Sequence, residues 1–206
     1  MKKIVGILFF SMAISISAQS DVKRFLKLSS PLKKWVLLHP FKAKLSLKIS
    51  NETKRVADSI RKSHLLDKNA AGGQVDAFRH AYWMARLCQE VGESAARSLG
   101  KGYEKDNFIT YKKIKLEEGV VPDEIASKMD LHNNEEGLKL ITKGSKVSKI
   151  GLIYRVINAI QKGKMKIIKK DKKGNFLTCE GVIIYLDELK GKWKNNKCLI
   201  NSNLKL

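Results

Sequence analysis

The sequence predicts a mainly α-helical protein: one bundle-like helical domain that carries a small basic C-terminal appendage containing a β-hairpin. Apolar residues recur every three or four positions through most of the chain, which is the period of a helix. The segment 74–91 is apolar on nearly every side, and such a helix belongs in the middle of a bundle. Beyond Gly163 the helical pattern ends. We therefore place the helical domain at residues 19–162 and the appendage at residues 163–206.

Residues 1–18 have the pattern of a cleavable secretory signal peptide. Lys2 and Lys3 precede an almost unbroken apolar run from Ile4 to Ile16, and small residues follow it. The run is shorter than the roughly 20 apolar residues that a membrane-spanning helix needs, so it favours a signal peptide over an anchor. We expect cleavage near Ala18, a periplasmic or secreted bacterial protein, and no transmembrane span in the mature chain.

The chain is strongly basic, with a formal net charge of +21 over 206 residues. Removal of the signal peptide would take away two lysines and no acids, so the exported protein stays basic. Such a charge attracts an anionic substrate, an anionic polymer or a membrane surface, and does not distinguish among them. A solvated lysine-rich surface without a dedicated partner is an equal alternative. No recognisable nucleic-acid module is present, and the oligomeric state is left open.

Helix boundaries follow from proline, glycine and capping residues. Ser30 and Pro31 begin a short helix that Pro40 interrupts. Two helices are expected next, at residues 41–49 and about 51–64, the second capped by Ser50 or Asn51. The remaining expected helices cover residues 74–91, 93–106, 122–142 and 147–161, with a looser stretch at residues 107–121.

The C-terminal appendage has a different pattern. Residues 165–168 and 175–178 flank a charged turn, which predicts a small β-hairpin between them. Residues 182–186 fit a helix or a strand equally well.

Three cysteines raise the question of a disulfide. Cys88 lies in an apolar helical pattern and is interpreted as a core residue, whereas Cys179 and Cys198 flank a short basic segment. Because export favours oxidation, we expect Cys179 to pair with Cys198, although sequence does not fix connectivity. No cysteine spacing typical of a zinc site is present.

The central helix carries a polar stripe that its apolar surroundings do not explain. Asp76 and His80 are four residues apart and therefore lie on one face, with Trp83 on the next turn and Arg79 beside them. Burial of such groups costs solvation free energy unless each finds a partner. We therefore expect a second polar surface to face this helix.

The segment 129–137 provides that surface. Asp130, Asn133, Asn134 and Gly137 follow three- and four-residue spacing, and a glycine there allows another backbone to approach closely. The expected joint site has these members: Asp76, His80, Asp130 and Asn134. An oxygen-rich site with one imidazole suits a divalent metal or general acid–base chemistry. The alternative is structural, because buried polar groups can hydrogen-bond one another and fix helix register.

These segments resemble a bacterial domain family of unknown function, found in secreted proteins and at the ends of toxin-like proteins. Its signature is DAFRHAYW, here Asp76 to Trp83, then an Ala-His-Glu element, then MDLxNN, here Met129 to Asn134. The middle element aligns with Gly102 to Glu104, which keeps the acid but has tyrosine in place of histidine. The resemblance covers residues 30–145. It implies a fold and a site rather than a reaction.

The resemblance adds one residue to the candidate metal ligands, which become Asp76, His80, Glu104 and Asp130. The tyrosine leaves this set one histidine short of the family pattern. The first functional hypothesis is a metal-dependent hydrolase of an anionic phosphoester, with a divalent metal as the cofactor. Its candidate catalytic residues are Asp76, Arg79, His80, Asp130 and Asn134. In this hypothesis Arg79 clamps the substrate anion, or instead pairs with Asp76. The alternative is a non-enzymatic cell-envelope protein that binds an anionic polymer or a membrane surface.

Overall fold

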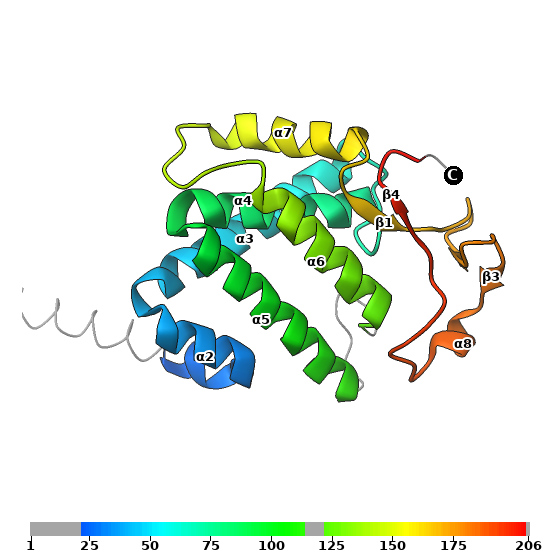
Figure 1. Ribbon diagram of the computed structural model, residues 1–206, viewed down its shortest axis with the longest axis horizontal. Coiled ribbons are helices and arrows are strands. Elements are labelled where there is room, and N and C mark those ends of the chain that lie inside the picture. The colour runs from blue at the N-terminus through cyan, green and yellow to red at the C-terminus, as the bar shows by residue number, and fades with distance from the viewer. Residues whose placement is uncertain (1–21, 114–121, 205–206) are drawn as a thin grey trace, which may run out of the picture.

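The computed structural model describes residues 22–113 and 122–204 and shows a mainly helical protein, as the sequence predicts (Figure 1). The predicted signal peptide and part of the looser stretch expected at 107–121 lie outside the described residues. After helical residues 22–27, the helices are α2 (Ser30–Leu38), α3 (Pro40–Lys62), α4 (Gln74–Val91), α5 (Glu93–Lys112), α6 (Glu124–Leu138), α7 (Lys149–Gln161) and α8 (Leu186–Leu189). Within the described ranges, no helix has both the length and the apolar character needed to cross a bilayer.

Helix α4 is the centre of the fold, with the bounds that the sequence predicts. It packs against α3, α5, α6 and α7, so it lies in the middle of the bundle (Figure 1). Ala77, Phe78, Ala81 and Tyr82 on this helix have no exposed surface. A helix that contacts neighbours on nearly every side must be apolar nearly all round, which is the pattern seen in the sequence.

The prediction of two helices over residues 41–64 is wrong, because α3 is one continuous helix. Ser50, expected as an N-cap, instead donates a hydrogen bond to the Ser46 carbonyl one turn back. Its hydroxyl also accepts a hydrogen bond from Trp83 of α4. The polar residues near the middle of α3 therefore mark a contact with α4 rather than a helix end.

Two other boundaries also shift. Helix α5 extends through Asn107 to Lys112, so the first part of the expected looser stretch is helical. Helix α6 begins after its N-cap Asp123, whose side chain accepts a hydrogen bond from the Ala126 amide, and it ends at Leu138 rather than at residue 142.

Gly137 allows α6 to lie close against α4. A Cβ atom at this position would be 2.7 Å from the Ala81 Cα, a separation that real Cβ atoms essentially never show. Only glycine permits this backbone approach. The prediction that Gly137 provides a close helix contact is confirmed, and the contact brings the polar residues of the two helices together.

The C-terminal strands pair differently from the predicted hairpin. Strand β1 (Lys166–Ile168) pairs antiparallel with β4 (Leu199–Asn201), and β2 (Phe176–Leu177) pairs with β3 (Ile183–Ile184). Around the expected charged turn, Lys170 and Phe176 form an isolated antiparallel bridge, and the Leu177 amide donates to the Lys169 carbonyl.

The burial of β1 explains the difference. Ile167 and Ile168 are buried, and β1 lies against α4 and α6. The strand that pairs with β1 is therefore β4, near the end of the chain, rather than β2, which follows β1 in the sequence. Residues 182–186, for which the sequence allows a helix or a strand, contain strand β3 and the first residue of α8.

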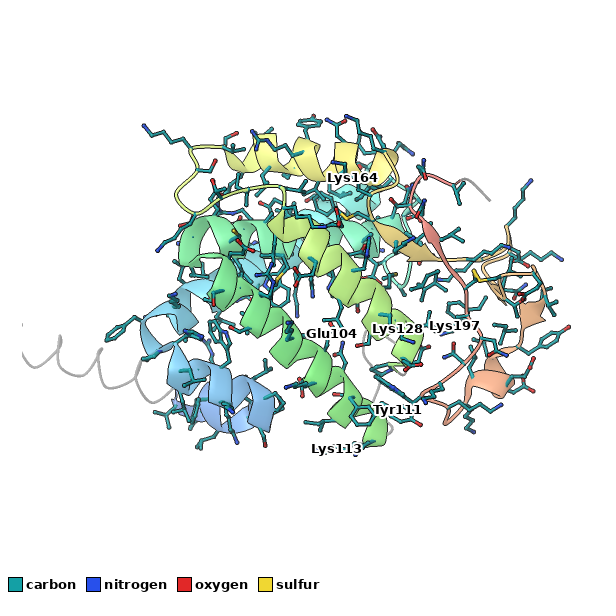
Figure 2. The ribbon with its side chains drawn as sticks, in the orientation of Figure 1. Glu104, Tyr111, Lys113, Lys128, Lys164 and Lys197 are labelled. Carbon is teal, nitrogen blue, oxygen red and sulfur yellow. A yellow bond between two sulfur atoms is a disulfide. The ribbon has the colours of Figure 1, made fainter. Side chains whose placement is uncertain are left out.

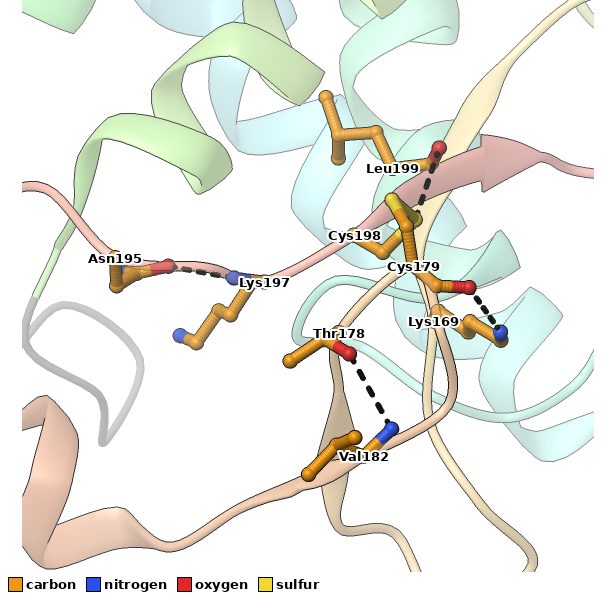
Figure 3. The surroundings of a disulfide bond; sticks show 8 residues. All are labelled: Lys169, Thr178, Cys179, Val182, Asn195, Lys197, Cys198 and Leu199. Carbon is orange, nitrogen blue, oxygen red and sulfur yellow. Dashed lines mark hydrogen bonds between the residues drawn. A yellow bond between two sulfur atoms is a disulfide. The ribbon is translucent and has the colours of Figure 1, made fainter.

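The predicted disulfide between Cys179 and Cys198 is confirmed, with a Cα–Cα distance of 4.8 Å (Figure 3). Cys88 is a free, buried thiol, also as expected. The bond joins the segment after β2 to the residue that precedes β4. It therefore connects the two small sheets.

The appendage is attached to the helices by buried polar contacts. Lys197, only 6% exposed, forms an ion pair of 2.5 Å with the N-cap carboxylate Asp123. The Ser202 hydroxyl donates to the Ile160 carbonyl, and the Gln74 side chain donates to the Ser202 carbonyl. Residues 163–204 thus pack on α4, α6 and α7 rather than extending from them.

Candidate functional site

The two predicted polar stripes face each other across α4 and α6. Asp76 and His80 from α4 and Asp130 from α6 each offer one ligand atom, and these atoms lie within 4.8 Å of one another. The His80 Nε2 atom is 3.3 Å from Asp130 Oδ1 and 3.6 Å from Asp76 Oδ1. All three side chains are buried. The sequence prediction that these residues meet is confirmed.

Asn134 orients the histidine ring. Its Oδ1 atom is 3.3 Å from the Nδ1 atom of His80, while the Arg79 guanidinium lies 3.2 Å from Nε2. Because an arginine can only donate, Nε2 accepts from it, and Nδ1 carries the proton that goes to Asn134. The Nε2 lone pair therefore faces the Arg79 guanidinium, and a carboxylate oxygen of Asp130 and one of Asp76 lie 3.3 and 3.6 Å from the same nitrogen. An imidazole fixed in this way is typical of a metal ligand.

The environment of His80 keeps the ring neutral. Burial, and next the charge of Arg79, lower its pKa to about 4, against the smaller opposing effects of Asp76 and Asn134. A neutral ring has a lone pair to offer, whereas a protonated ring has none.

Arg79 forms the ion pair that the sequence left as one of two alternatives. Its Nη2 atom is 2.6 Å from Asp76 Oδ1, the same oxygen that faces His80. The guanidinium thus places a positive charge beside the carboxylate and the imidazole. The Arg79 guanidinium therefore neutralises part of the negative charge of Asp76 and Asp130.

A loop held by the appendage fixes the other oxygen of Asp76. The Gly72 amide donates to Asp76 Oδ2 at 2.6 Å, and Gly72 has a positive φ of 80° that favours glycine. In turn, the Ile168 amide of β1 donates to the Gly72 carbonyl, and Lys170 donates to the Ala71 carbonyl. The C-terminal segment therefore supports the position of a site carboxylate, a role that sequence reasoning did not find.

Glu104, the fourth expected ligand, accepts hydrogen bonds from α5 and α6. This buried carboxylate on α5 accepts hydrogen bonds from Ser127 of α6 at 2.7 Å and from Asn107 at 3.2 Å (Figure 2). It is not a member of the group formed by Asp76, His80 and Asp130. The hydrogen bond from Ser127 joins α5 to α6.

Asn133 also serves a different purpose from its neighbour Asn134. Its side-chain amide donates to the Lys166 carbonyl and accepts from the Lys166 amide, at 3.0 and 2.8 Å. It therefore binds β1 to α6 like a strand partner. Only part of the predicted stripe on α6 faces His80.

A cavity of about 250 Å³ opens onto the site. Its lining residues are Ser50, Thr53, Lys54, Arg79, His80, Trp83 and Tyr103. Tyr103 packs edge-on against Trp83, with ring centroids 5.3 Å apart. The residues from α3 were not predicted as site residues, because nothing in their spacing distinguishes them from an ordinary amphipathic helix.

A comparison with known families matches residues 33–164 to the family described as "Domain of unknown function (DUF6973)". The chain belongs to this family. The DUF6973 match includes Asp76, His80 and Asp130 and ends just before β1. This match confirms that the chain contains a domain of unknown function, as the sequence motifs indicated. No curated protein and no solved structure matches the chain.

Proposed function

We propose that this protein is a metal-dependent hydrolase of an anionic phosphoester and that Asp76, His80 and Asp130 hold a divalent cation. The observation that supports this most is the convergence of one imidazole nitrogen and two carboxylate oxygens within 4.8 Å, with His80 on the wall of a cavity. A tetrahedral site with metal–ligand bonds of about 2.1 Å holds its ligand atoms roughly 3.4 Å apart. The separations of 3.3 and 3.6 Å around His80 Nε2 are close to that value.

The donor set narrows the choice of cation. One imidazole and two carboxylates suit zinc or manganese, whereas calcium and magnesium prefer oxygen ligands alone. Three protein ligands leave a position open for water or substrate, as in catalytic sites. A divalent cation at this point lowers the pKa of a water and neutralises charge that develops on a phosphoryl oxygen.

The cavity supports an anionic substrate. Lys54 and Arg79 line it beside His80. In the hydrolysis, water adds to phosphorus, the P–O ester bond breaks, and the leaving oxygen takes up the proton that the water gives up. Arg79 pairs with Asp76 in the structure, and its guanidinium would be available to bind a phosphate oxygen if a divalent cation were held by that carboxylate. Asn134 holds His80 in the tautomer that this arrangement requires.

Export to the periplasm or the medium is part of the proposal. The Cys179–Cys198 disulfide supports it, since such bonds persist in oxidising compartments. The net charge of +21 favours a substrate or surface that is anionic.

The test combines metal binding with turnover. Protein stripped with a chelator should bind zinc or manganese in a 1:1 ratio and then hydrolyse a chromogenic phosphodiester. Asp76→Asn and His80→Gln should lose both properties, while Asp187→Asn, an exposed residue of α8, should keep them. Wild-type protein that binds no metal and hydrolyses no phosphoester would leave the alternative, a non-enzymatic envelope protein that binds an anionic polymer or membrane surface.

A further inference from the structure

Two further cavities adjoin the site cavity, one on each side. A cavity of about 440 Å³ shares Ser50, Trp83 and Tyr103 with it. Another of about 310 Å³ shares Lys54 and Arg79. The three cavities together form an extended groove, and His80 of the Asp–His cluster lies on the wall of its middle part.

The larger cavity is apolar. Its wall is formed by the residues before α2, by α2 itself and by α3, and includes Phe25, Leu28, Leu32, Trp35, Val36 and Leu47. Its volume lies within the range of about 300–1,000 Å³ that is usual for ligand pockets, which are mostly apolar with a few polar groups. The mostly apolar wall of this cavity suits a hydrocarbon chain.

The charges around the groove complement an anionic amphiphile. Arg24, Lys27 and Lys44 contribute to the wall of the apolar cavity. Arg61 lines the cavity on the other side of the site, together with Lys54 and Arg79. A ligand with an apolar chain and a phosphate would place each part against a surface of matching character.

The corner between α2 and α3 exposes apolar side chains beside this cavity. Phe41 is 99% exposed, and Leu37 and Leu38 are 70% and 65% exposed. Their neighbours Val36 and Ala43 line the apolar cavity. Exposed aromatic and leucine side chains in a lysine-rich segment are typical of contact with an anionic membrane surface. The entrance of the cavity thus carries the features of a surface that takes a lipid from a bilayer.

We infer that the groove binds an anionic phospholipid, with one acyl chain in the apolar cavity and the phosphate at Arg79 and His80. The inference rests on the proposed function for the reaction, because it names the substrate class of that same site. The binding of the acyl chain depends only on the apolar cavity, whose wall includes none of Asp76, His80 and Asp130. Phospholipid binding and metal-dependent hydrolysis can therefore be tested separately.

Tryptophan fluorescence gives a direct test of where the chain lies. Trp35 and Trp83 line the apolar cavity, whereas Trp193 of the appendage packs against Phe108 and Tyr111 of α5. In a Trp193→Phe background, lysophosphatidylglycerol with a brominated acyl chain should quench the fluorescence saturably, and the unbrominated lipid should not. Absence of saturable quenching by the brominated lipid would overturn the inference.

A variant that fills the cavity provides the second test. Ala43→Phe should weaken binding of the brominated lipid by at least about tenfold, because the ring takes space that the chain needs. The matched control is Ile150→Phe on α7, which is 68% exposed and away from the groove, and it should bind like wild type. Equal affinity of the two variants for the lipid would contradict the inference.

Chain length gives a measurement that needs no variant. For wild-type protein, affinity for lysophosphatidylglycerols should rise by up to about fourfold for each added methylene that the cavity holds. Affinity that does not depend on chain length would overturn the inference.

The two proposals fail in different ways. If the metal-loaded protein hydrolyses a soluble phosphodiester but the brominated lipid does not quench, the lipid inference is wrong and the proposed function stands. If the lipid quenches but the protein binds no metal, the lipid inference stands and the hydrolase is wrong.

Discussion

Gly137 of α6 lies directly against the backbone of Ala81 in α4, one residue from His80. This contact sets the separation of the two helices that carry the candidate site. Asp130 lies two turns before Gly137 on α6 and meets His80 across the same interface at 3.3 Å. The geometry of the site therefore depends on a glycine that has no chemical role in it.

We predict that Gly137→Ala lowers the free energy of unfolding by about 1–3 kcal/mol, because the added methyl group must push the helices apart. Urea denaturation measures the change. The matched control is Gly102→Ala on α5, where a Cβ would be 3.7 Å from its nearest neighbour, an ordinary contact. That variant should be as stable as wild type or more so, since alanine favours a helix more than glycine by about 1 kcal/mol. Similar losses in both variants would contradict the proposed close contact.

Arg79→Gln should bind the divalent metal more tightly than wild type and hydrolyse phosphoester more slowly. The substitution removes a positive charge that is 2.6 Å from Asp76 and competes with a cation there. It also removes the group proposed to bind the substrate phosphate. Calorimetry with zinc and steady-state kinetics give the two readouts. Weaker metal binding in the variant would show that Arg79 supports the cluster rather than competing for it.

Loss of the Cys179–Cys198 disulfide should loosen the appendage and leave the helices folded. In the chain-entropy model, closing a loop of this size contributes about 3 kcal/mol. Hydrogen exchange of a Cys179→Ser/Cys198→Ser variant should speed up in β1 to β4 and stay slow in α4. Cys88→Ser is the control for thiol replacement and keeps the disulfide. Global unfolding of the double variant would mean that the helical domain depends on the appendage.

The ion pair between Lys197 and Asp123 should be costly to break from one side only. Lys197→Met leaves Asp123 as a buried, uncompensated charge, and we expect a loss of about 3–5 kcal/mol. Adding Asp123→Asn should recover much of this loss, because asparagine can still cap α6. Thermal unfolding of the single and double variants measures both effects. A single variant as stable as wild type would show that the pair contributes little.

The sequence predicts the helices well where one face of the helix is buried, or where the helix is buried on all sides. The bounds of α4 follow from its apolar pattern between Gly73 and Gly92, and the meeting of His80 with Asp130 follows from the three- and four-residue spacing. Local propensity was misleading at Ser50, because a hydroxyl that binds Trp83 across the bundle has the same local pattern as a cap.

The features that the sequence did not predict depend on contacts between segments that are far apart in the chain. The pairing of β1 with β4 and the support of Asp76 by Gly72 and Ile168 join residues that are far apart in the chain. Thr53 and Lys54 reach the site cavity only because α3 is continuous and lies across α4. No local period of the sequence specifies such relationships.

The most direct test of the account is a calorimetric titration of zinc into metal-free wild-type protein and into Asp130→Asn, which keeps the shape of the side chain and removes its charge. The account predicts one site per chain in the wild type and an affinity at least about tenfold weaker in the variant. Asp187→Asn should match the wild type. Equal zinc affinity in wild type and Asp130→Asn, or no stoichiometric binding in the wild type, would contradict the assignment of Asp76, His80 and Asp130 as a metal site.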